Sequence, residues 1–236
     1  MNQFDVAIVS FLNSFARRSH AFDTLMSVVE SNYLIKGGVV TALLWWVWFQ
    51  SDDQQDERRG AVLSGVIACI AAIVAGRTLA LTLPFRERPL RNLAFQFRTP
   101  YGVDEHTLIH WSSFPSDHAA LFFALATSIF FVSRRAGILA YVHALFVVCF
   151  TRIYLGFHYP TDILAGALLG IGIASLFNTI TIRKTIAKPT LRWLHGHPAS
   201  FYASFFLLTS QISVMFDPLR QLGRVAIVAV KAALKH

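Results

Sequence analysis

Long apolar runs separated by short polar segments dominate the chain. Six of these runs approach or reach the length that crosses a bilayer, about 20 residues. They cover residues 33–50, 60–84, 118–132, 136–156, 163–182 and 199–216. The shortest, 118–132, needs the preceding polar PSDH segment to complete a span. The pattern predicts an all-α membrane protein with a bundle of six transmembrane helices in residues 23–216.

The two ends of the chain alternate apolar and polar residues. In residues 1–22, Asp5 comes early, the arginines follow the apolar part and no small-residue cleavage site is present. This is not the pattern of a secretory signal peptide. We expect a helix lying in the membrane interface over 1–22 and an amphipathic helical tail over 217–236.

Composition and charge narrow the class of partner. The chain is 55% hydrophobic and 14% charged, with a net charge of +8. Its basic residues are spread over short loops and helix ends, with no soluble domain to form a nucleic-acid groove. We therefore expect no nucleic-acid partner; the expected partners are the bilayer and a phosphorylated lipid. Only two cysteines occur, so no disulfide framework is present.

The polar segments divide between two membrane faces. If each span crosses once, 51–59, 133–135 and 183–198 lie on one face, opposite 85–115 and 157–161. The first group is rich in arginine and lysine, which indicates the cytoplasmic face. The opposite face nevertheless keeps five cations: Arg86, Arg88, Arg91, Arg98 and Arg152. Cations retained on the disfavoured face indicate an anionic ligand there.

Three polar clusters fall on that second face: PFRERP (84–89), FPSDH (114–118) and RIYLGFHYPTD (152–162). Singly, each has an ordinary explanation, as arginines extending to the membrane surface or as Ser, Asp and His near a helix start. Pro115 and Pro160 suit the first turns of helices, so His118 and His158 are placed near two helix N-termini. Such termini bind anions, and Arg88 and Arg152 match phosphate oxygens. Together they predict a phosphate site.

The spacing of the third cluster predicts a nucleophile. Asp162 comes one helical turn after His158, close enough to accept its ring N–H. That bond would fix the tautomer and leave the other ring nitrogen free to attack phosphorus. His118 then remains as the proton donor to a leaving group.

Two other chemistries fit less well. A serine hydrolase would need Ser116 on a strand-to-helix elbow, and no strand precedes it. A zinc site could recruit His106 and His110 of HTLIH, but the HExxH pattern is absent. We therefore expect no metal and no cofactor.

RERP, PSDH and TRIYLGFHYPTD resemble the three motifs of the type 2 phosphatidic acid phosphatase (PAP2) superfamily, usually written KxxxxxxRP, PSGH and SRxxxxxHxxxD. The resemblance covers roughly residues 60–180. Leu81 stands where the family has lysine, so Arg77 or Arg86 is expected to supply that charge. Asp117 replaces glycine, and Thr151 replaces serine while keeping the hydroxyl.

The resemblance implies a role for each matching residue. His158 would form a phosphohistidine, Asp162 would orient and stabilise it, and His118 would protonate the departing lipid oxygen and then activate water. The residues expected at the phosphate are Arg88, Arg152, Ser116, Asp117, Arg77 and Arg86.

The resemblance also implies a substrate and a location. The PSDH variant is similar to that of bacterial undecaprenyl-diphosphate phosphatases, so we expect a multi-pass protein of the bacterial cytoplasmic membrane that hydrolyses undecaprenyl diphosphate on the periplasmic or outer face. Phosphatidic acid, phosphatidylglycerol phosphate and lipid A phosphates stay open as substrates, as does phosphotransfer to a second lipid. A non-catalytic transporter with an anion pocket is the alternative outside the enzymes.

Overall fold

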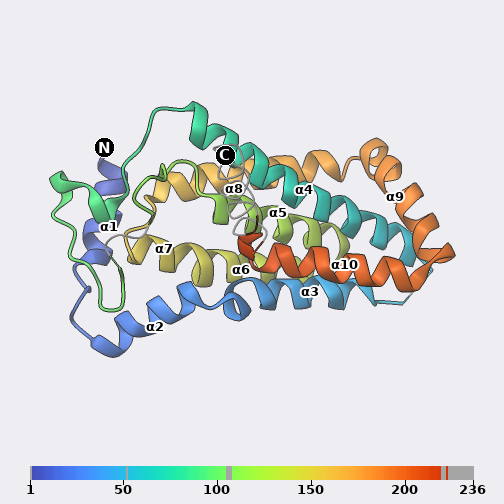
Figure 1. Cartoon of the computed structure of the whole chain (residues 1–236), viewed down its shortest axis with the longest axis horizontal. Helices are drawn as coiled ribbons and strands as arrows, with labels where there is room; N and C mark the ends of the chain where they lie inside the picture. The colour runs from blue at the N-terminus through green and yellow to red at the C-terminus, as the bar shows by residue number, and fades with distance from the viewer. Residues whose placement is uncertain (1, 52, 105–107, 219–221, 223–236) are drawn as a thin grey trace, which may run out of the picture.

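The computed structural model describes residues 2–51, 53–104, 108–218 and 222, and these form helices joined by turns and loops, with no strands among them. The helices lie mostly along one long axis (Figure 1). In chain order they are α1 (Gln3–Asn13), α2 (His20–Ser31), the π-helical turn η1 (Leu34–Gly38), α3 (Val39–Trp48), α4 (Gln55–Thr82), the 3-10 turns η2 (Pro89–Arg91) and η3 (Leu93–Phe95), α5 (Asp117–Val132), α6 (Arg134–His143), the π-helical turn η4 (Ala144–Cys149), α7 (Phe150–Tyr154), α8 (Pro160–Phe177), α9 (Ile180–Gly196) and α10 (Pro198–Ser213).

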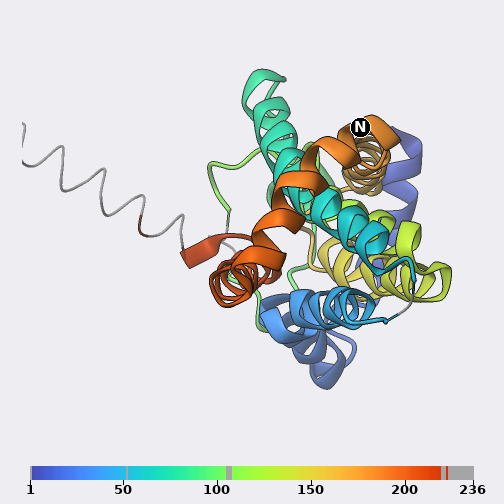
Figure 2. The same ribbon diagram turned by 90° about the vertical axis from the view of Figure 1, so that its right-hand side faces the viewer.

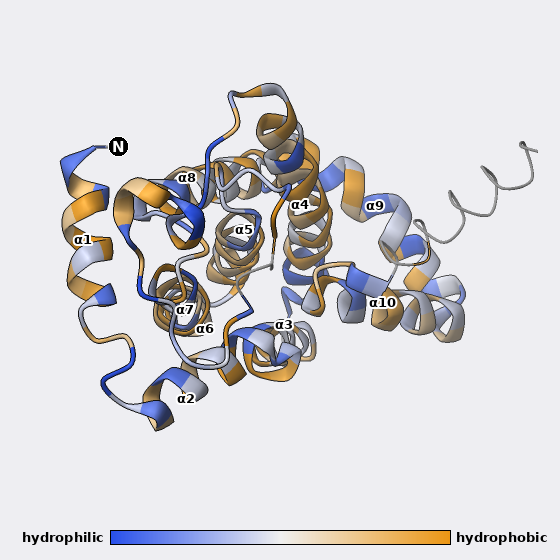
Figure 3. Cartoon of the chain, turned by 60° about the vertical axis from the view of Figure 1, so that its left-hand side comes forward, coloured by the Kyte–Doolittle hydropathy of each residue, from blue (hydrophilic) through white to orange (hydrophobic). Residues whose placement is uncertain are grey.

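Helix α5 lies at the centre of the bundle (Figure 3). Around it lie α4, α8, α3 and the continuous helical segment formed by α6, η4 and α7. Most of its side chains are buried, including Leu121, Phe122, Leu125 and Ile129. Because apolar residues are distributed all round α5 rather than on one face, the sequence suits a helix enclosed by others. The central helix also carries His118 in its first turn, which places that residue inside the bundle end.

Glycines bring α8 close to α5. A Cβ at Gly166 would lie 2.4 Å from the carbonyl oxygen of Ser116, and one at Gly170 would lie 2.2 Å from that of Ala120. The two glycines are four residues apart and so share one helix face. Small residues at this spacing let transmembrane helix backbones approach closely. The contact holds the N-termini of α5 and α8 together.

The number of membrane spans is only partly supported. Among the described residues, three helices are long and apolar enough to cross a membrane: Gln55–Thr82, Arg134–Tyr154 and Pro160–Phe177. Leu34–Trp48 and Asp117–Val132 are shorter apolar helices. The expected sixth span, 199–216, corresponds to the 16 residues of α10. The apolar runs therefore did mark helices, while the count of six spans stays a prediction.

Two segments differ from the sequence expectation. The polar stretch 183–198 was expected as a break, but most of it lies in α9, which continues through Pro189 and crosses α4 at one end of the bundle (Figure 2). Ala187 of α9 packs on Gly60 of α4, and this contact gives a polar helix a buried face. Residues 1–22 were expected as one helix, but α1 ends at Asn13 and α2 begins at His20. The 217–236 tail lies outside the described residues apart from 217, 218 and 222.

Candidate active site

A tight turn between α7 and α8 brings together the residues of the third polar cluster, 152–162. Gly156 has φ +75°, a conformation that favours glycine, and a Cβ there would lie 2.6 Å from the Phe97 ring. The turn reverses the chain after Arg152, in the last turn of α7, and Pro160 begins α8 directly afterwards. Arg152 and His158 are therefore both buried at the same end of the bundle.

The ring of His158 is held by a backbone carbonyl. Its Nδ1 lies 2.8 Å from the carbonyl oxygen of Ser113, which can only accept, so Nδ1 carries the proton. The nearest oxygen of Asp162 is 3.6 Å from Nδ1, so the expected direct hydrogen bond is replaced by the bond to Ser113. Burial lowers the pKa of His158 well below 6.5, and the charges of Arg88 and Arg152 lower it further. The imidazole is thus neutral, with its lone pair on Nε2.

Asp162 is fully buried and accepts hydrogen bonds from two groups other than His158. Its Oδ2 accepts a hydrogen bond from the backbone N–H of Tyr159, with an N–O distance of 2.8 Å. Its Oδ1 accepts one from Nη1 of Arg86, with an N–O distance of 2.5 Å. Arg86 also donates to Asp5 of α1 at 2.7 Å. Asp162 therefore fixes the start of α8 and leaves a negative charge close to His158.

Arg88 is locked by main-chain acceptors. Its guanidinium donates to the carbonyl oxygens of Trp111 at 3.1 Å, Ser112 at 3.1 Å and Phe157 at 2.5 Å. Its Nη1 lies 3.4 Å from Nε2 of His158. Burial, aided by the charge of Arg152, lowers the pKa of Arg88 to about 9, so the group is still charged at neutral pH. A fixed cation therefore lies beside the unprotonated nitrogen.

His118 and Arg152 form the second pair. The Nη1 of Arg152 lies 3.2 Å from Nε2 of His118 and 2.6 Å from Oε1 of Glu30 in α2. His118 comes from the first turn of α5 and faces the same cavity as His158. The two histidines thus reach the cavity from the ends of different helices, with arginines beside both.

Asp117 is neutralised by an arginine. Its carboxylate pairs with Arg77 of α4 at 3.0 Å, and the Arg77 guanidinium lies 3.8 Å above the Trp111 ring. Leu81, at the position of the family lysine, has an exposed fraction of 83%. Arg77, one turn earlier, is therefore the residue of α4 that brings positive charge to the cavity.

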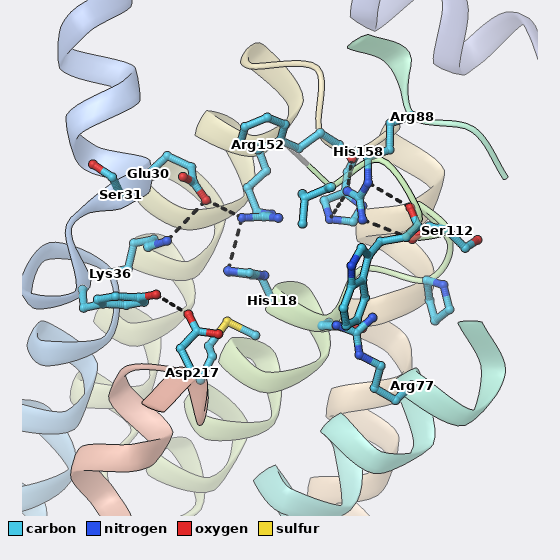
Figure 4. Close-up of a pocket in the computed structure, with 17 residues that line it drawn as sticks. Glu30, Ser31, Lys36, Arg77, Arg88, Ser112, His118, Arg152, His158 and Asp217 are labelled. Carbon is cyan, nitrogen blue, oxygen red and sulfur yellow. Dashed lines mark hydrogen bonds and ion pairs between the residues drawn. The ribbon is translucent and has the colours of Figure 1, made fainter. Parts of the chain in front are cut away.

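A cavity of about 340 Å³ joins these groups. Figure 4 shows His158, Arg88 and Arg77 on one side, Arg152 and His118 in the middle, and Glu30 and Lys36 on the other. Four cations line it: Lys36, Arg77, Arg88 and Arg152. Such a surface suits a phosphorylated ligand.

Two of the expected phosphate ligands do not line this cavity. Ser116 is buried and its hydroxyl accepts the N–H of Ala119, so it caps α5. Arg86 pairs with Asp5 and Asp162 instead. The cavity adds Glu30 and Lys36, which the motifs do not contain. Ser113 does not line the cavity but holds His158 through its backbone carbonyl. Of these three residues, Lys36 has a sequence pattern that could have indicated it, a lysine within an apolar run.

The structure describes one of the two histidines of HTLIH. His106 lies outside the described residues, and His110 is exposed in a turn. Among the described residues no three His, Cys, Asp or Glu side chains come together in a group able to hold a metal ion.

A family model described as the PAP2 superfamily matches residues 61–186. The chain is 38% identical over 117 residues to the bacitracin transport permease protein BcrC of Bacillus licheniformis, covering 50% of this chain and 51% of that protein. It is 26% identical over 170 residues to the undecaprenyl-diphosphatase BcrC of Bacillus subtilis, covering 72% and 80%. The crystal structure of a PAP2 type phosphatidylglycerolphosphate phosphatase from Bacillus subtilis has a TM-score of 0.49 and 20% identity, covering 73% of this chain and 82% of that one.

Proposed function

Because the chain belongs to the PAP2 superfamily, we propose that it is a membrane lipid phosphatase that acts through a phosphohistidine on His158. One observation carries the proposal most strongly. His158 donates its Nδ1–H to a backbone carbonyl, which leaves the Nε2 lone pair at a cavity with Arg88 3.4 Å away. A neutral, oriented imidazole beside fixed cations is suited to attack phosphorus.

The reaction divides into two steps. In the first, the Nε2 lone pair of His158 forms a bond to the terminal phosphorus, the bond from that phosphorus to the oxygen of the leaving group breaks, and that oxygen, which in a diphosphate is the bridging oxygen, takes a proton from His118. In the second, water attacks the phosphorus, its proton passes to His118, and the P–N bond breaks to release inorganic phosphate. Arg88 and Arg152 stabilise the charge on the phosphate oxygens in both steps. Asp162 stabilises the positive charge that His158 carries between them.

The proposed substrate is a polyprenyl diphosphate, with undecaprenyl diphosphate converted to undecaprenyl phosphate. The undecaprenyl-diphosphatase among the relatives supports this substrate, as does the number of cations along the cavity. The rival substrates are phosphatidic acid, phosphatidylglycerol phosphate and lipid A phosphate.

We also propose that the site faces the periplasm or the outside of the cytoplasmic membrane. The cavity lies beside the C-terminal half of α4, where Arg77 lines it, whereas the basic helix α9 packs on Gly60 near the N-terminus of α4. The site and the basic helix are thus at opposite ends of a helix long enough to span. By the positive-inside rule, α9 marks the cytoplasmic side.

Phosphate release from a panel of lipids tests the function. The purified protein, in detergent and excess EDTA, is given undecaprenyl diphosphate, phosphatidic acid, phosphatidylglycerol phosphate and lipid A. We expect release from undecaprenyl diphosphate at the highest kcat/KM. A preference for another lipid would reject the substrate but keep the enzyme class, and no release from any lipid by folded protein would reject the function. Reaction in ¹⁸O-labelled water separates hydrolysis, which labels the released phosphate, from transfer to a second lipid.

A further inference from the structure

The cavity continues past His118 and Arg152 to a side that the three motifs do not supply. Glu30 near the end of α2 and Lys36 in η1 line this side (Figure 4). Lys36 has an exposed fraction of only 5%. A lysine buried this deeply is costly unless an anion compensates its charge.

One carboxylate at present compensates both cations of this side. Oε1 of Glu30 lies 3.3 Å from Nζ of Lys36 and 2.6 Å from Nη1 of Arg152. The other nearby acid, Asp217, accepts a hydrogen bond from Tyr33 and comes from beyond the end of α10. Glu30 is therefore the acid whose oxygen contacts Lys36 and Arg152 together.

Arg152 has further binding capacity. The residue is 3% exposed, and among the described residues its Nε has no hydrogen-bond partner. A buried guanidinium nitrogen without an acceptor is costly, and an anionic oxygen would satisfy it. The Nη1 of Arg152 contacts both Glu30 and His118, so the guanidinium lies between the side of the cavity with Lys36 and the side with His158.

A single phosphate at His158 does not require Lys36. That phosphate already has Arg88 at the nucleophile and Arg152 at the centre of the cavity. Lys36 is joined to this centre through Glu30, whose carboxylate contacts both Lys36 and Arg152. A ligand that reaches Lys36 while its phosphorus is at His158 must carry a second anionic group beyond the bond that breaks.

We propose that Lys36 binds the second phosphate of a lipid diphosphate, the one attached to the lipid, that Arg152 is shared between this phosphate and the one at His158, and that the second phosphate displaces the carboxylate of Glu30. The inference rests on the proposed function and names the substrate feature that the same site recognises. A phosphate oxygen replaces a carboxylate oxygen between the same two cations, so the charge on this side stays compensated.

The subsite also assists the first chemical step. When Nε2 of His158 bonds to the terminal phosphorus, the bond to the bridging oxygen breaks and its electron pair stays on that oxygen. The oxygen now belongs to the lipid monophosphate, whose added negative charge Lys36 and Arg152 stabilise, and it takes its proton from His118. Lys36 is therefore a specificity-determining residue for a diphosphate.

A comparison of two substrates tests the subsite. Farnesyl diphosphate and farnesyl monophosphate share one chain and differ by one phosphate. Lys36→Met should lower kcat/KM for the diphosphate by about ten- to a hundredfold, the effect of one lost charged hydrogen bond. For the monophosphate it should change little. Lys36→Arg should restore most of the diphosphate activity, and Lys184→Met, on the exposed face of α9, is the matched control.

Inhibition by inorganic anions separates ligand binding from a purely structural ion pair. In wild-type protein, pyrophosphate should inhibit more strongly than phosphate. Lys36→Met should abolish this difference, whereas Glu30→Gln, which removes the competing carboxylate, should increase it. If the pair of Lys36 and Glu30 is purely structural, both variants should lower the stability of the protein by a similar amount.

Two results would overturn the subsite. They are an unchanged ratio of the kcat/KM values for the two farnesyl substrates in Lys36→Met, and weaker pyrophosphate inhibition in Glu30→Gln. If wild-type protein releases no phosphate from any lipid, the proposed function itself fails. The two failures are therefore distinguishable.

Discussion

His158 donates its Nδ1–H to the carbonyl oxygen of Ser113 at 2.8 Å, while the nearest oxygen of Asp162 lies 3.6 Å from the same nitrogen. The tautomer of the nucleophile is thus fixed by the main chain of the segment before α5. Asp162 contributes its charge and the position of the α8 N-terminus. This division of roles has a measurable consequence.

Asp162→Asn should reduce kcat moderately. Where an aspartate alone fixes the catalytic tautomer, its replacement by asparagine costs about 10⁴-fold. Here Ser113 keeps the tautomer, so we expect a loss of about ten- to a hundredfold from the missing negative charge. Steady-state kcat on a lipid diphosphate measures this, and a loss near 10⁴-fold would show that Asp162 sets the tautomer.

The pH dependence follows from the lowered pKa of His158. Because the folded state binds this proton only below 6.5, the unfolded state binds more protons just below that pH, and stability falls as the pH drops. Above 6.5 this residue makes no pH-dependent contribution. The acid limb of kcat/KM should therefore lie below pH 6.5. An acid limb above pH 6.5 would contradict the assignment, and His158→Gln should lose less thermal stability between pH 7.5 and 5.5 than wild-type protein.

Asp5 should stabilise the bundle although it lies outside every motif. It is fully buried, pairs with Arg86 at 2.7 Å and accepts the N–H of Thr161 at 2.9 Å. Asp5→Ala leaves buried donors unsatisfied, which costs on the order of 1–3 kcal/mol. Thermal unfolding in detergent should show this loss. The control Asp56→Ala removes an exposed acid whose contacts with Arg59 and His195 are 4.0 Å and 3.5 Å long, and it should change little. Equal effects would reject the role of Asp5.

The sequence predicted some of the helices and some of the residues at the cavity, and the others were missed for physical reasons. Apolar runs mark helices because they must be buried in lipid or protein, but the polar α9 with Pro189 gave no such signal. Motif spacing placed His118, His158 and Arg152, since a short turn and two helix starts determine their positions. Ser113 acts through its backbone carbonyl, which every residue has. Lys36 precedes Arg152 by more than a hundred positions, and only the packing of η1 brings it to the cavity.

The sequence did not indicate the partners of Arg86. We expected it as a candidate to replace the family lysine, whose position Leu81 occupies, and in the structure Asp5 of α1 and Asp162 of α8 pair with it. Because α1 was expected at the membrane interface, an acid from α1 beside Arg86 was not foreseen. The N-terminal segment is thus part of the support of the site.

The membrane orientation is tested by labelling single cysteines. Asp104→Cys, in the exposed loop at the site end, should react with an impermeant maleimide in intact spheroplasts. Asp53→Cys, before α4, should react only after lysis. Cys69 and Cys149 are buried and give little background. The reverse labelling pattern would invert the orientation.

The covalent intermediate on His158 tests the central claim most directly. Protein is mixed with a polyprenyl diphosphate carrying ³²P in its terminal phosphate, quenched in alkali, which preserves phosphohistidine, and counted for bound label. His118→Ala should accumulate label, because water is no longer activated while the phosphate leaving group still departs. His110→Ala, altered in an exposed turn, should turn over like wild-type protein. The account predicts that His158→Ala, folded by size-exclusion chromatography, carries no label and releases no phosphate; label or substantial turnover in that variant would contradict it.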